Sequence, residues 1–143
     1  MTKIGNVETL QKGKITMTKI LVAEDDKLIS NSLCDALKAN GFETIPAYDG
    51  EEAVAKAKAE KPDLALLDIL MPKMDGISVL WELRANPSTA KTPVIVLTNL
   101  GDMETISKIV EAGAVDYLLK SDQSMDDVVK KVKEVLSRSV QLT

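Results

Sequence analysis

The stretch LALLDILMPKMDG, residues 64–76, decides how the chain folds. Its first four residues are apolar without polar alternation, which is typical of a strand buried on both faces of a sheet. The run ends on a carboxylate, Asp68, and the chain then turns at Pro72 and Gly76. A lone aspartate in this place is usually a turn residue or a helix N-cap. The role of Asp68 therefore depends on what the other strands bring beside it.

Composition limits the class of protein. The chain has 143 residues, of which 45% are hydrophobic and 28% charged, as expected for one globular domain. A formal net charge of −4 argues against a nucleic-acid-binding surface, which needs a basic footprint. No apolar run approaches the roughly 18 residues of a membrane span, and the N-terminus is unlike a secretory signal. We therefore expect a cytoplasmic protein.

Two residue types restrict the chemistry further. The chain contains no histidine, which excludes Ser-His-Asp and Cys-His catalysis and histidine-ligated metals. Its single cysteine, Cys34, can form neither an intrachain disulfide nor a thiolate metal cluster, and its apolar neighbours predict core packing. The only tryptophan, Trp81, is expected at the edge of the core, with an exposed contact to a partner protein as the alternative, because Leu80 and Leu83 already supply the apolar stripe of its helix. Any reaction must use carboxylates, lysines, hydroxyls and hard cations.

Short apolar runs alternate with segments of helical period. We predict strands at 19–23, 42–47, 63–68, 93–98 and 114–120, and helices at 27–40, 50–61, 77–86, about 102–112 and 125–139. Five such units predict an α/β fold, with a parallel five-stranded sheet covered by helices on both sides. Pro46 marks the second run as an edge strand. Residues 17–140 form this domain, and residues 1–16 are expected to be a flexible leader or the remnant of an upstream start.

Polar side chains gather where the predicted strands end, which is where open parallel sheets bind their ligands. The residues are Glu24, Asp25 and Asp26 after the first strand, Asp68 after the third, Thr98 after the fourth and Lys120 after the fifth. Each alone could be a helix cap or a solvated side chain, but four strand ends on one rim favour a site. Carboxylates about 4 Å apart repel by roughly 4 kcal/mol at an effective dielectric of about 20. Oxygen ligands suit Mg²⁺. The set therefore resembles the groups that phosphoryl transfer needs: a metal ion, a cation, a hydroxyl donor and a nucleophilic oxygen.

Four motifs carry a resemblance to a known family. ILVAEDD (20–26), LLDILMPKMDG (66–76), VIVLT (94–98) and GAVDYLLK (113–120) make residues 17–138 resemble the receiver domain of two-component response regulators. The resemblance implies a flavodoxin-like (βα)5 fold with strand order 2-1-3-4-5. It also implies that Asp68 accepts a phosphoryl group from a phosphohistidine. Because the chain has no histidine, the donor must be a separate histidine kinase, a phosphotransfer protein or a small phosphate compound. Such a domain catalyses only its own phosphorylation and dephosphorylation and is not otherwise an enzyme.

The resemblance also assigns the metal ligands. Mg²⁺ would be held by Asp25, by Asp68 and by the backbone carbonyl of Leu70, with Glu24 acting through water. Asp26 lies outside this set. Pro usually follows the lysine in a cis peptide, whereas this chain has Ser121, so we expect a trans bond because non-proline cis bonds cost about 3 kcal/mol.

The remaining roles concern signalling. The resemblance implies that Thr98 and Lys120 contact the phosphoryl oxygens and that Tyr117 is a switch aromatic whose rotamer follows Thr98. The face of helix 102–112, strand 114–120 and helix 125–139 would then repack for a downstream protein target, without direct nucleic-acid contact or membrane insertion. Leu70 and Leu100 are apolar where the family tunes water access, which predicts slow self-dephosphorylation.

Several alternatives stay open. The chain could be a receiver cut from a larger multidomain regulator, or a receiver that is not phosphorylated and serves as a scaffold. A phosphatase of the haloacid dehalogenase type also uses a strand-end aspartate with Mg²⁺, but it normally has a second aspartate where this chain has Leu70. A flavodoxin-like phosphate binder is disfavoured because the acidic residues 24–26 would repel the phosphate.

Overall fold

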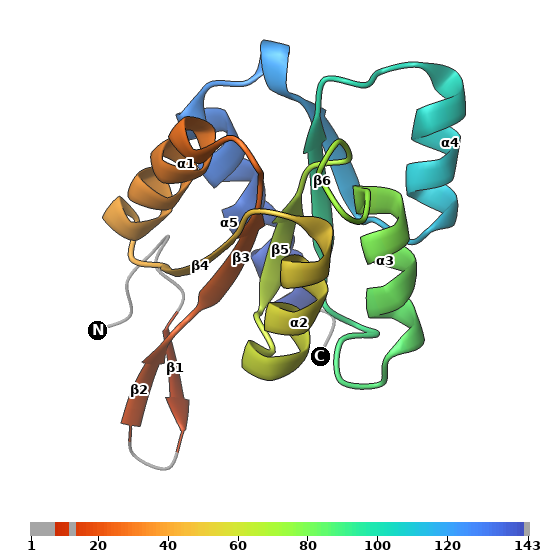
Figure 1. The fold of residues 1–143 in the computed structure, drawn as a ribbon. Helices are drawn as coiled ribbons and strands as arrows, with labels where there is room; N and C mark the ends of the chain where they lie inside the picture. Colours follow the sequence, from red (N-terminus) through yellow and green to blue (C-terminus); the bar gives the residue numbers. More distant parts are fainter. Residues whose placement is uncertain (1–7, 12–13, 142–143) are drawn as a thin grey trace.

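One parallel sheet organises the chain, as the computed structural model of residues 8–11 and 14–141 shows (Figure 1). Its strands lie in the order β4-β3-β5-β6-β7 and are all parallel. The strands are β3 (Lys19–Ala23), β4 (Glu43–Ala47), β5 (Leu64–Leu67), β6 (Val94–Thr98) and β7 (Asp116–Leu119). Counted within this sheet, the order is 2-1-3-4-5, so the predicted α/β topology is confirmed, including the edge position of the strand that contains Pro46.

Helices cover both faces of the sheet. They are α1 (Lys27–Ala39), α2 (Gly50–Glu60), α3 (Gly76–Ala85), α4 (Met103–Glu111) and α5 (Met125–Gln141), with a short 3-10 helix, η1 (Lys120–Asp122). Alternate strand residues feed two cores: Leu21 and Leu67 pack with α2, α3 and α4, whereas Val22 and Leu66 pack with α1 and α5. Cys34 is buried in the second core, as expected. The central strands β3, β5 and β6 are thus buried on both faces, which explains their apolar runs, whereas the edge strands β4 and β7 are only partly buried.

Four helices begin at an aspartate that caps backbone amides of the first turn. The carboxylates of Asp26, Asp49, Asp75 and Asp102 accept bonds of 2.9, 2.7, 3.0 and 3.0 Å at the starts of α1, α2, α3 and α4. Such caps contribute about 0.5–2 kcal/mol each. Because the strands are parallel, they all end at one rim of the sheet, and these four caps lie in the loops beyond that rim.

Two features differ from expectation. Strands β1 (Glu8–Gln11) and β2 (Lys14–Met17) form a separate antiparallel sheet within the segment expected to be a flexible leader; residues 1–7 and 12–13 lie outside the described part, and flexibility stays a prediction. Trp81 is 50% exposed, so its predicted packing at the core edge is wrong, because Leu80 and Leu83 already form the buried stripe of α3.

No described helix is long and apolar enough to cross a membrane.

Candidate functional site

The predicted site residues from three strands meet at one rim of the sheet. Glu24 and Asp25 follow β3, Asp68 follows β5 and Lys120 follows β7. The Nζ atom of Lys120 lies 2.5 Å from Oε1 of Glu24 and 2.7 Å from Oδ2 of Asp68. One ammonium group therefore joins two carboxylates that come from different strands.

Asp68 is held at both carboxylate oxygens. Its Oδ1 accepts a hydrogen bond of 2.7 Å from the amide of Ile69, and its Oδ2 accepts the bond from Lys120. Its own amide donates to the carbonyl of Ala23 at 3.0 Å, which extends the pairing of β3 with β5 by one residue. The residue is only 7% exposed. The backbone and Lys120 together fix the direction of this carboxylate, so its role is not that of a turn residue or a helix cap.

Glu24 and Lys120 form a coupled, largely buried pair. Burial raises the pKa of the Glu24 carboxyl above its ordinary value, although hydrogen bonds from Lys120 and from the amide of Asp26 oppose this. Burial also acts against the charge of Lys120, but its hydrogen bonds to Asp68 and Glu24 raise the pKa of the ammonium overall. Lys120 is therefore protonated at neutral pH and supplies positive charge to the rim.

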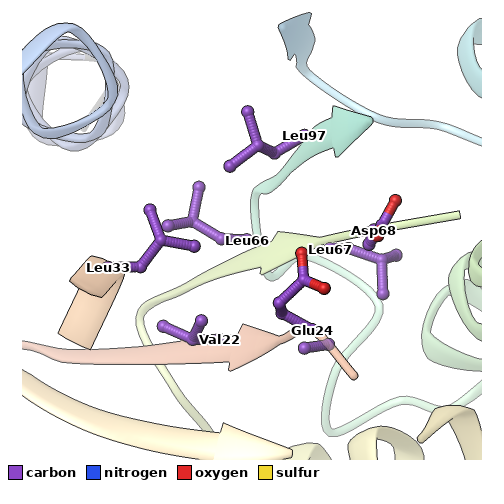
Figure 2. A pocket seen from close by; sticks show the side chains of 8 residues that line it. Val22, Glu24, Leu33, Leu66, Leu67, Asp68 and Leu97 are labelled. Carbon is purple, nitrogen blue, oxygen red and sulfur yellow. The ribbon is translucent and has the colours of Figure 1, made fainter. Parts of the chain in front are cut away.

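The wall behind the two carboxylates is apolar. Figure 2 shows Glu24 and Asp68 beside the side chains of Val22, Leu33, Leu66, Leu67 and Leu97, which with Ala23 line one narrow hollow. Hydrocarbon on this side lowers the local dielectric and strengthens the interactions of the charges. The two carboxylates thus lie at the rim with an apolar layer beneath them.

Three carboxylates are close enough to share a cation. Oxygen atoms of Glu24, Asp25 and Asp68 all lie within 4.8 Å of one another; Asp25 is the exposed member and the other two are buried. The donors are all hard oxygen ligands, which is the set that Mg²⁺ prefers. The residues present fit a magnesium ion.

The other predicted residues surround this cluster. Thr98 ends β6, is buried, and its hydroxyl accepts a bond of 3.3 Å from the amide of Leu100. Tyr117 is partly buried on β7 and packs against the core beneath α2, α3 and α4. Asp26 caps α1 and is directed to backbone amides. None of the described peptide bonds is cis, which confirms the expected trans bond between Lys120 and Ser121.

Sequence reasoning missed one residue that shapes the rim. The side-chain oxygen of Asn99 accepts a hydrogen bond of 3.1 Å from the amide of Ser121. This contact ties the segment that carries Lys120 to the loop after β6. The available signal was its place, since Asn99 directly follows Thr98 at a strand end.

Comparison with known proteins places these features in a family. A model described as the response regulator receiver domain matches residues 20–133. Among curated proteins, the chain is 42% identical over 123 residues to the alkaline phosphatase synthesis transcriptional regulatory protein PhoP of Bacillus subtilis, covering 85% of this chain and 49% of that one. It is 35% identical over 126 residues to the transcriptional regulatory protein PdtaR of Mycobacterium tuberculosis, covering 87% and 60%. The chain thus spans about half to three fifths of these relatives.

Solved structures agree. The receiver domain of the Francisella response regulator 1452 has a TM-score of 0.78 and 35% identity, with 85% of this chain and 98% of that chain covered. A CheY-like receiver domain protein from Methanospirillum hungatei has a TM-score of 0.84 and 28% identity, with 90% and 100% covered.

Proposed function

The chain belongs to the response regulator receiver domain family, and on that premise we propose that it accepts a phosphoryl group on Asp68 in a reaction that needs Mg²⁺. The receiver would span residues 17–140. The observation that carries the proposal is the placement of Asp68, whose carboxylate is buried, held at both oxygens and bonded to Lys120. A carboxylate whose direction is fixed in this way is suited to attack a phosphorus atom that enters from the rim.

The proposed step transfers one phosphoryl group. A carboxylate oxygen of Asp68 attacks the phosphorus of a phosphohistidine, an oxygen–phosphorus bond forms, and the phosphorus–nitrogen bond breaks. The leaving imidazole nitrogen keeps the bonding pair. Lys120 already contacts the attacking carboxylate, and its ammonium group would stabilise the negative charge that develops on the phosphoryl oxygens. Thr98, at the end of the neighbouring strand, would donate its hydroxyl to the same oxygens.

The metal site would use the same rim. Asp25, Asp68 and the carbonyl of Leu70 would bind Mg²⁺ directly and Glu24 would act through water. The close grouping of the Glu24, Asp25 and Asp68 oxygens supports a metal at this place. When bound, the ion supplies charge neutralisation for the phosphoryl oxygens. In this structure the Lys120 ammonium, which bonds to both Glu24 and Asp68, compensates part of the negative charge of these carboxylates.

The proposed partners are a histidine kinase or phosphotransfer protein as donor and a protein target as receiver of the signal, in the cytoplasm. Thr98 and Tyr117 would relay the change to the face formed by α4, β7 and α5. Exposed apolar side chains on this face support the proposal: Met103 is 76% exposed and Val110 is 63% exposed. The alternatives are a receiver that is not phosphorylated and serves as a scaffold, and a receiver that is part of a larger regulator. An aspartate-based phosphatase is more remote.

The test is direct phosphorylation of the full chain. Wild type, Asp68→Asn and Asp75→Asn are incubated with Mg²⁺ and acetyl phosphate, and intact mass is measured. Asp75 is the matched control, because it is an exposed aspartate in the same loop whose carboxylate caps α3. We expect one added phosphoryl group on wild type and on Asp75→Asn, and none on Asp68→Asn. Absence of an adduct on wild type, with no binding of beryllofluoride by fluorine NMR, contradicts the proposal.

A further inference from the structure

The loop between β5 and α3 is held by the first residues of two helices. This loop, residues 69–75, leads from Asp68 and contains Leu70. On one side, the amide of Gly76 at the start of α3 donates to the carbonyl of Ile69 at 2.8 Å. On the other side, the amide of Gly50 at the start of α2 donates to the carbonyl of Pro72 at 3.2 Å. The segment that contains Leu70 is therefore held by a hydrogen bond from α2, which is distant in sequence, as well as by one from α3, which directly follows it.

The loop adopts a conformation that does not persist without support. Lys73 has a φ of 71°, and the amide of Met74 donates to the carbonyl of Pro72 at 2.8 Å, which is the pattern of a γ-turn with positive φ. This conformation is strained for a residue with a side chain, and surrounding structure must hold it. The carbonyl of Pro72, at one end of this turn, is the atom that Gly50 contacts.

Gly50 is also pressed against the backbone of the loop. A Cβ atom at this position would lie 1.9 Å from the carbonyl oxygen of Met74 and 2.6 Å from its Cβ, whereas real Cβ atoms stay beyond 3.0 Å. The neighbouring atom is backbone and not a flexible side chain, so the loop would have to move by at least about 1 Å. The φ of Gly50 lies outside the left-handed region, so glycine is required here by space and not by conformation.

We infer that the first turn of α2 positions the metal-binding loop and that Gly50 is a positioning residue for the Leu70 carbonyl. Gly50 is not one of the proposed metal ligands or phosphoryl-binding residues. It acts through Pro72 and Met74, which set the path of the chain after Leu70. Supporting residues of this kind typically change metal affinity by about 10–100-fold when they are altered. The inference rests on the proposed magnesium site and adds to it the element that holds one ligand in place.

The experiment measures Mg²⁺ binding to the dephosphorylated full chain by isothermal titration calorimetry, with thermal stability in parallel. Gly50→Ala is expected to raise the Kd for Mg²⁺ by at least about tenfold. The matched control is Gly113→Ala, which is strained by a φ of 96° and would meet Nε of Arg84 at 3.0 Å, near the start of β7 and away from the rim. It should lower the melting temperature and leave the Kd unchanged, which separates positioning from general destabilisation.

A second pair of variants keeps the test valid if Gly50→Ala does not fold. Asp49→Ala removes the cap that holds the first turn of α2 and the ion pair from Lys73 to Asp49, whose atoms lie 3.7 Å apart. Asp102→Ala removes the equivalent cap of α4. We expect weaker Mg²⁺ binding only for Asp49→Ala.

The outcomes separate the two proposals. If wild type binds no Mg²⁺, the proposed function loses its metal site. If wild type binds Mg²⁺ and both Gly50→Ala and Asp49→Ala bind it equally well, the positioning role is overturned while the proposed function stands.

Discussion

Replacing Lys120 by methionine removes a cation that bonds to both Glu24 and Asp68 while keeping a side chain of similar length. Two unit charges 4.8 Å apart, the upper limit for oxygen atoms in this cluster, repel by about 3.5 kcal/mol at an effective dielectric of about 20. Removing one partner of a buried ion pair costs about 3–5 kcal/mol. The Lys120 side chain is 17% exposed, so we expect the lower end, about 3 kcal/mol, without added metal.

The assay is urea unfolding followed by circular dichroism, with EDTA present. The control is Lys131→Met, which removes a 3.1 Å ion pair to Asp116 in which both side chains are about a quarter exposed. That pair should contribute less than about 1 kcal/mol. For a domain of this size, the Lys120→Met loss corresponds to a fall of about 10 °C in melting temperature.

The pH dependence supplies a second check. The pKa of Lys120 is raised in the folded protein, so its stabilisation is complete below its ordinary pKa and is lost only as pH rises through the raised value. At neutral pH the lysine contribution is therefore full. The difference between wild type and Lys120→Met should shrink as pH falls and the Glu24 carboxyl, whose pKa is raised by burial, takes up a proton and no longer pairs with the ammonium. A loss no larger than that of Lys131→Met, or one that is equal at neutral and acid pH, would refute the reasoning.

Three further predictions follow from other contacts. Burial raises the pKa of the Glu24 carboxyl, so the stabilisation from its protonated form is full below the ordinary pKa and is lost as pH rises through the raised pKa. The stability of Glu24→Gln relative to wild type should therefore increase from acid to neutral pH. A difference in urea unfolding that does not change with pH would contradict this. Arg84 donates from Nη2 to the carbonyl of Gly113 at 2.8 Å and from Nη1 to further carbonyls. Arg84→Lys should therefore lower the free energy of unfolding by about 2 kcal/mol, measured by thermal unfolding. A loss below about 0.5 kcal/mol would show that the planar guanidinium is not needed. The double variant Leu70→Asn, Leu100→Glu should lose its phosphoryl group faster than wild type after the donor is removed, and an equal lifetime by intact mass would show that these side chains do not limit water access.

Local sequence was sufficient for the elements of the sheet. The central strands β3, β5 and β6 consist almost entirely of buried apolar residues, whereas the edge strands β4 and β7 are mixed and only partly buried. The helices have apolar stripes that pack on the sheet, and α1 to α4 begin at capping aspartates. The end of a strand is visible in the same way, which is why Glu24, Asp68, Thr98 and Lys120 could be assigned to one rim. The predicted boundaries agree with the observed ones within about two residues, the usual uncertainty at element ends.

Tertiary structure alone decided how these residues meet. Lys120 bonds to Glu24 and Asp68, which lie 96 and 52 residues away in the sequence. A local sequence pattern cannot predict a contact between residues so far apart. The same holds for Asn99 with the amide of Ser121 and for Gly50 against the backbone of Met74. The sequence by itself determined which residues reach the rim, because periodicity and strand ends are local properties of the chain. Which atoms bind, which charge is neutralised and which loop is held in place depend on packing between segments distant in sequence, and that is set only when the sheet and its helices assemble.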